Sequence, residues 1–186
     1  KINIYNQFIN YSENIDDYNT LVIYLEKLYD ILTDDREKKN IKLTALEFHK
    51  INKNYSYLIA EIERLLNLSS FNDKRLFLNL ELGKIYYQMK DYSSAKQIFY
   101  NITSDNSKKK ETAEAFYLLA KINIEESFDF STTKELLEKS KNEKSSSKAG
   151  KLAKKTITKI EALEDLIYEY NLSTNIDSSQ NNEVLR

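Results

Sequence analysis

Side chains that could act as acid or base catalysts are few in this chain, and they are scattered. His49 is the only histidine among 186 residues, and no carboxylate pair or serine motif stands near it at a useful spacing. A partly buried or surface position on a helix is therefore its simpler interpretation. The acidic pairs Asp34-Asp35 and Glu125-Glu126 fall at expected helix ends, where carboxylates interact with the helix dipole. The sequence predicts a protein that is not an enzyme.

Cofactor and metal sites are not indicated either. The acidic pairs lack the alternating oxygen ligands and the central glycine of a calcium loop, and no glycine-rich phosphate loop is present. The chain contains no cysteine, which excludes disulfides, thiolate metal sites and cysteine nucleophiles. No apolar run reaches the roughly 18 residues that a membrane-spanning helix needs. We therefore expect no cofactor, no metal and no transmembrane segment.

Charge is distributed unevenly towards the end of the chain. Residues 139–159 contain eight lysines and one acid, Glu143, whereas residues 161–186 contain six acids and only Arg186 as a base. Such a basic stretch could contact nucleic acid, an anionic membrane or an acidic protein tail, or it could be a solvated helix face. Arginine, which usually supplies base contacts, is scarce, so nucleic acid is disfavoured as a partner.

A repeat organises the chain. A short polar residue followed by an aromatic ring recurs four times, and successive rings are separated by 37, 37 and 38 residues. A constant period of this size is typical of arrays in which similar modules pack side by side. An ordinary bundle of helices of similar length is the alternative interpretation. The four dipeptides are Asp17-Tyr18, Asn54-Tyr55, Asp91-Tyr92 and Asp129-Phe130.

The residues after each ring predict a helix. Offsets of 3, 7 and 10 residues return to one side of a helix with 3.6 residues per turn, and mostly apolar side chains occupy these offsets in every unit. Apolar pairs that lie about ten residues before each ring belong to a preceding helix. Each unit therefore reads as helix, tight turn, helix. The residues at the three offsets are Leu21, Leu25 and Leu28, then Leu58, Ile62 and Leu65, then Ala95, Phe99 and Ile102, then Thr133, Leu137 and Ser140, the last of which breaks the apolar series.

The third and fourth units share a pattern of aromatic, aliphatic and small residues in both of their helices. The pattern consists of Leu82, Gly83, Tyr86, Tyr92, Ala95 and Phe99 in the third unit, and of Phe116, Leu119, Ala120, Phe130, Thr133 and Leu137 in the fourth. These units resemble tetratricopeptide (TPR) repeats, and in the third unit Asn79 takes the place of the tryptophan of the first helix. This resemblance implies an all-α fold, a right-handed α-solenoid of about four TPR-like helical hairpins over residues 1–146. The first two units keep only the aromatic and aliphatic skeleton.

A long capping helix is predicted over residues 147–171, because a row of residues spaced by 3 and 4 runs along it without a turn signal. Serines at 145–147 supply hydroxyl caps for its start. Residues 172–186 are rich in Ser, Asn and Asp, which predicts a disordered tail or a linker. The row consists of Ala153, Thr156, Ile160, Leu163, Ile167 and Tyr170.

The TPR resemblance also implies where a ligand would bind. In such arrays the residue after the small first-helix residue points into a concave groove, which here gives Lys84, Lys121 and Lys154. Lysines interleaved with rings suit an acidic, partly apolar peptide. An alternative is that these lysines only keep the surface soluble. The apolar residues expected on the same face are Phe77, Tyr87, Tyr117 and Ile124.

Two functions follow from these expectations. The first is a non-catalytic protein–protein interaction scaffold that binds a protein or peptide segment in its groove. The alternative is a structural spacer or an assembly subunit of a larger complex, without a groove ligand. The last hairpin is followed by serines at 145–147 and by a helix start that reads Lys-Ala-Gly-Lys-Leu-Ala-Lys-Lys at 148–155. This arrangement resembles the TPR lipoproteins of bacterial envelopes, which implies a periplasmic or envelope-associated location slightly in preference to the cytoplasm.

Overall fold

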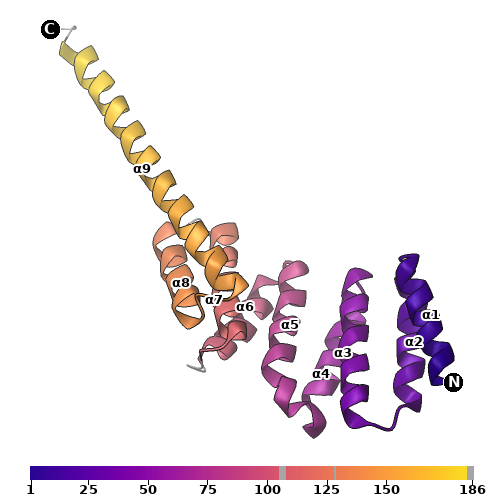
Figure 1. The fold of residues 1–186 in the computed structure, drawn as a ribbon. Coiled ribbons are helices and arrows are strands. Elements are labelled where there is room, and N and C mark those ends of the chain that lie inside the picture. Colours follow the sequence, from indigo (N-terminus) through magenta and orange to yellow (C-terminus); the bar gives the residue numbers. More distant parts are fainter. Residues whose placement is uncertain (105–107, 128, 184–186) are drawn as a thin grey trace. The chain divides into compact units, whose positions relative to one another are not determined.

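The structure, a computed structural model, describes residues 1–104, 108–127 and 129–183, with residues 174–183 described as helical backbone. Within these ranges the chain is built of α-helices and one short 3-10 helix, and no strand occurs (Figure 1). The prediction of an all-α fold is confirmed. The elements are α1 (Ile2–Asn14), α2 (Tyr18–Ile31), α3 (Asp35–Ile51), α4 (Tyr55–Leu66), η1 (Ser69–Lys74), α5 (Arg75–Gln88), α6 (Tyr92–Thr103), α7 (Lys110–Glu126), α8 (Phe130–Glu143) and α9 (Lys148–Glu183).

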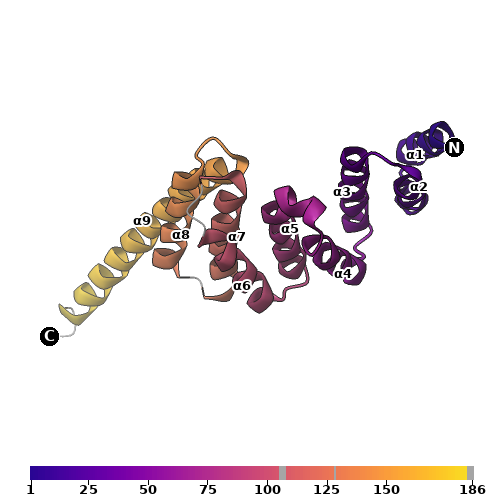
Figure 2. The ribbon, with the colours of Figure 1, turned by 90° about the horizontal axis from the view of Figure 1, so that it is seen from below.

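The chain divides into two compact units, Lys1–Ala95 and Lys96–Arg186, and the division falls inside α6. In the first unit each helix from α1 to α5 packs on the next one along the chain (Figures 1 and 2). Three fully buried residues, Leu21, Leu25 and Ala45, join α2 to α3. Partly buried hydrophobic side chains pack around them, namely Ile9, Tyr18, Ile41 and Phe48.

In the second unit α7 packs on α8, and α9 packs on both of them. Small side chains on α7 and α9 are buried, including Ala113, Ala120 and Ala153, each with 0% exposure. Small residues let helix axes approach closely, so α7, α8 and the start of α9 form the compact part of this unit. The predicted boundaries at residues 146 and 171 stay predictions.

The apolar offsets predicted from the aromatic rings hold in all four repeats. Residues 3, 7 and 10 positions after each ring are buried without exception, including the polar Thr133 and Ser140, both with 0% exposure. The hydroxyl of Ser140 donates to the carbonyl oxygen of Ala113 at 2.7 Å, which satisfies its hydrogen bond inside the core. A serine therefore continues the stripe at the point where the sequence indicated a break.

Three of the predicted turns have the same backbone structure. The residue before each polar-aromatic dipeptide is left-handed: φ is 55° at Asp16, 54° at Lys53 and 62° at Lys90. In each turn the next amide donates to a carbonyl five residues earlier, for example from Asp91 to Tyr86 at 3.0 Å. This is a Schellman-type helix end, which satisfies carbonyls that the helix leaves free. The matching position of the fourth turn, Phe128, lies outside the described residues.

The polar residue of the dipeptide then begins the following helix. Asp17, Asp91 and Asp129 accept hydrogen bonds from backbone amides two or three residues ahead, as N-caps do. These hydrogen bonds lower the pKa of all three carboxyl groups. The largest cause in each case is a hydrogen bond from a Thr or Ser side chain three residues ahead, that of Thr20, Ser94 or Thr132. At three of the four dipeptides the polar residue therefore caps a helix and the partly buried ring begins it, whereas Asn54 precedes α4 without a side-chain cap hydrogen bond.

Glycine at the left-handed positions should stabilise the chain. A residue with a Cβ atom pays about 1 kcal/mol or more in this conformation, and glycine does not. We expect Lys53→Gly and Lys90→Gly each to raise the free energy of unfolding by about 1 kcal/mol in urea titrations. Lys27→Gly, inside α2, is the control and should lower it, because glycine disfavours a helix interior. Destabilisation by Lys90→Gly would contradict the turn geometry.

Helix α9 differs from the expected capping helix in its second half. Ala153 and Ile160 of the predicted row are buried, but Leu163, Ile167 and Tyr170 are 41%, 44% and 68% exposed. The reason is geometric, because α9 continues past α7 and α8 and these helices no longer cover it (Figures 1 and 2). The α9 backbone runs on to Glu183, whereas a tail was expected from residue 172. Residues 184–186 of that tail lie outside the described residues.

None of the helices in the described ranges combines the length and the apolar character that a bilayer crossing requires.

Candidate functional site

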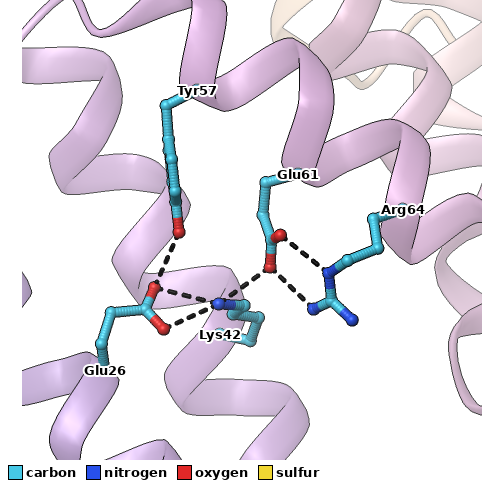
Figure 3. A network of polar contacts seen from close by, with 5 residues as sticks. All are labelled: Glu26, Lys42, Tyr57, Glu61 and Arg64. Carbon is cyan, nitrogen blue, oxygen red and sulfur yellow. Dashed lines mark hydrogen bonds and ion pairs between the residues drawn. The ribbon is translucent and has the colours of Figure 1, made fainter.

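Charged side chains from three helices of the first unit meet around the buried Lys42 of α3. Its ammonium lies 2.7 Å from Glu26 Oε2 on α2 and 2.8 Å from Glu61 Oε1 on α4, and the residue is only 5% exposed. Figure 3 shows that Tyr57 approaches the same Glu26 and that Arg64 approaches Glu61. Tyr57 donates to Glu26 Oε1 at 3.1 Å, and Arg64 holds both oxygens of Glu61 at 2.8 Å. We call these five residues the Lys42 cluster.

Neighbouring charges keep Lys42 and Glu61 ionised. Burial alone would lower the pKa of Lys42, but hydrogen bonds to Glu26 and Glu61 outweigh it and raise the pKa above its usual value. Burial would likewise raise the pKa of Glu61, yet hydrogen bonds from Arg64 and Lys42 lower it. A lysine that is protonated and bound to two carboxylates is a poor nucleophile. The cluster is therefore suited to joining three helices.

Helix α3 makes two further ion pairs with other elements of the first unit. Lys50 Nζ lies 2.5 Å from Glu81 Oε2 on α5, and Lys84 Nζ lies 3.0 Å from the other carboxylate oxygen of Glu81. Burial would raise the pKa of Glu81, but the charges of Lys84 and Lys50 lower it. Near the start of α3, Lys39 lies 2.7 Å from Asp73 of η1, which is an exposed contact. Lysines of α3 thus reach four other elements of the first unit.

His49 lies beside the Lys42 cluster, and its ring centroid is 4.1 Å from that of Tyr57. Its Nε2 atom is buried and has no hydrogen-bond partner among the described residues. Burial is the main cause that lowers its pKa, so the imidazole is neutral at neutral pH. In the described ranges no group of three or more His, Asp or Glu residues is placed to hold a metal ion.

The predicted groove residues are divided between the two units. On α5 of the first unit, Phe77 is half-buried, Lys84 contacts Glu81, and the Tyr87 ring lies 5.8 Å from that of Tyr92. On α7 of the second unit, three residues are half-buried: Tyr117, Lys121 and Ile124.

Lys154, the remaining predicted groove residue, is exposed on α9. It lines an open hollow of about 590 Å³ together with Lys141 and Lys151. Each unit therefore carries its own part of the expected face, one on α5 and the other on α7 and α9.

The charged residues of α3 and its neighbours were not singled out from the sequence. A signal was present, because Lys42 lies three residues before the buried Ala45 and Glu61 lies three residues after the buried Leu58. A charge in phase with an apolar stripe indicates a buried ion pair. Comparison of the chain with protein-family models, with curated proteins and with solved structures finds no match.

Proposed function

We propose that the chain is a non-catalytic scaffold, a right-handed α-solenoid of TPR-like hairpins that binds an acidic, partly apolar segment of a partner protein. The observation that carries this proposal is the row Tyr117, Lys121 and Ile124 on α7. Spacings of 4 and 3 residues place the three on one helix face, and all are half-exposed. A ring, an ammonium group and an aliphatic side chain in one row can contact both the charged and the apolar parts of a peptide.

Helix α5 supports the proposal with a similar row. Phe77, Lys84 and Tyr87 are spaced by 7 and 3 residues, and each is half-exposed. The ammonium of Lys84 is held by Glu81, so its position is fixed before any ligand binds. A fixed side chain loses less conformational entropy on binding, which favours recognition.

A charge reversal of the three lysines tests the scaffold. Peptides rich in Asp, Glu and Leu should be enriched from a displayed random library by the wild-type chain. We expect the Lys84→Glu, Lys121→Glu, Lys154→Glu triple variant to lose this enrichment about tenfold or more, because each reversal replaces attraction with repulsion. The control reverses three exposed lysines outside the expected face, Lys27, Lys53 and Lys108, and should enrich like the wild type. Equal enrichment by both variants would refute the groove.

A spacer is the second candidate function, and the contacts of α3 favour it. Lys42 and Lys50 connect α3 to α2 through the partly exposed Glu26, and to α4 and α5 through carboxylates that are buried. Such contacts fix the relative positions of helices in the first unit, which a spacer needs and a groove does not. If no acidic peptide is enriched by the wild-type chain, the spacer is the function that remains.

A further inference from the structure

The second half of α9 carries apolar side chains that no other described element covers. Leu163, Leu166 and Tyr170 are 41%, 62% and 68% exposed. In Figures 1 and 2 this half of the helix extends beyond α7 and α8. Spacings of 3 and 4 residues put the three side chains on one face. An exposed apolar stripe of this kind commonly marks an interaction surface.

The stripe continues into the first half of the helix. At 100° per residue it runs back through Lys159, Thr156 and Leu152, about a quarter-turn away from the buried Ala153 and Ile160. Leu152 is 37% exposed and Thr156 is partly exposed, so this side of α9 is accessible between residues 152 and 170. The spacing of the six positions is 4, 3, 4, 3 and 4, which is the core pattern of a two-helix coiled coil. We call this set of six residues the α9 seam.

The two halves of α9 have opposite charges. Residues 148–159 contain five lysines and no acid, whereas residues 161–170 contain four acids and no base. One of these acids, Glu164, already contacts Lys134 of α8 at 2.6 Å. The acids Asp165 and Glu169 are exposed, as are the lysines Lys155 and Lys159. A helix with this charge order is complementary to a reversed copy of itself.

We propose that two copies of this chain associate through antiparallel pairing of their α9 seams. With the two-fold axis near Glu161, Lys159 of one copy lies in the core beside Leu163 of the other, and Lys155 faces Glu169 at the edge of the seam. The same register places Leu152 beside Tyr170 and Thr156 beside Leu166 of the second copy. Each contact occurs twice because the interface is isologous. A parallel pair would instead place lysine on lysine and acid on acid.

The length of the α9 seam determines the expected affinity of the dimer. From Leu152 to Tyr170 the helix is about 27 Å long, which is little more than two and a half heptads. Coiled coils of this length are weak, and Lys159 in the core weakens this one further. The dimer should therefore be concentration-dependent, forming in the micromolar range and dissociating on dilution.

Charge exchange provides the decisive test, with sedimentation equilibrium of the full chain as the measurement. We expect Lys155→Glu and Glu169→Lys each to weaken dimerisation about tenfold or more, and the double variant to restore it, since the pair is then reversed in both copies. Glu161→Lys, on the opposite side of α9, is the matched control and should dimerise at least as well as the wild type. Leu166→Glu should abolish the dimer while circular dichroism stays unchanged.

Orientation is tested by cysteine pairing, because the natural chain has no cysteine. A mixture of Leu152→Cys and Tyr170→Cys chains should form mixed disulfides under mild oxidation, and Tyr170→Cys alone should not form them. Rapid self-linking of Tyr170→Cys would indicate a parallel pair and overturn the proposal.

A chain that stays monomeric at millimolar concentration would also overturn the proposal, as would a monomer whose α9 instead binds a basic amphipathic peptide. No groove lysine takes part in the α9 seam, so these outcomes do not depend on the scaffold function.

Discussion

Lys42→Met should destabilise the first unit by about 2 kcal/mol. Breaking a buried ion pair costs about 3–5 kcal/mol when one charge is left alone, but here Arg64 still pairs with Glu61 and Glu26 is partly exposed. The loss should therefore fall below that range. Amide hydrogen exchange in α2, α3 and α4 of the full chain measures it, because the exchange reports on this unit separately from α7–α9.

Two variants make the Lys42→Met result specific. Lys39→Met removes an ion pair from the same helix, but Asp73 is an exposed partner, so the change should be less than about 1 kcal/mol. Adding Glu26→Gln and Glu61→Gln to Lys42→Met should recover part of the lost stability, because no unpaired carboxylate then remains. If Lys42→Met and Lys39→Met have equal effects, the Lys42 cluster does not stabilise the unit.

Gly150→Ala should destabilise the second unit by about 2–3 kcal/mol. A Cβ atom on Gly150 would meet the Lys144 carbonyl oxygen and lie 2.9 Å from Ser145 Cα, and both atoms belong to the backbone. The turn cannot retreat easily, because the hydroxyl of Ser147 donates to Lys144 O at 2.7 Å and accepts from Gly150 N at 3.0 Å. Overpacking of this kind costs about 1–3 kcal/mol or more and exceeds the gain of about 1 kcal/mol in helix propensity.

Exchange protection in α8 and α9 is the measurement for Gly150→Ala, together with the thermal midpoint. Lys151→Ala is the matched control, since it is the next residue on α9 and is exposed. Its effect should stay within about 0.5 kcal/mol. Propensity alone predicts that Gly150→Ala stabilises the helix, so an increase in stability would contradict the close approach of the α8–α9 turn.

The sequence predicted the helices well because two independent signals agreed in three of the four repeats. The residue before each ring is an N-cap at Asp17, Asp91 and Asp129, and the apolar offsets that follow are buried. Local rules of capping and periodicity determine such features, and they require no knowledge of the neighbouring helices. The left-handed residue at Lys53 and Lys90 was not predicted, because glycine is the usual signal there.

The charged contacts of α3 could not be predicted in the same way. Lysine and glutamate in a helix are normally exposed, and only the packing of α2 and α4 places Glu26 and Glu61 around Lys42. In the second half of α9 the sequence predicted an apolar face but not its exposure. Periodicity identified Leu163, Ile167 and Tyr170 as one face, but it cannot say whether another helix covers that face.

The ion pairs of α3 also limit how this protein can change by duplication. Lys42 and Lys50 need carboxylates that only α2, α4 and α5 provide. A hairpin copied to another place in the chain would carry a buried ammonium group without its counterion. Gene rearrangements that shuffle these modules should therefore yield poorly folded products, and lineages should vary the surfaces of α2–α5 far more readily than their order.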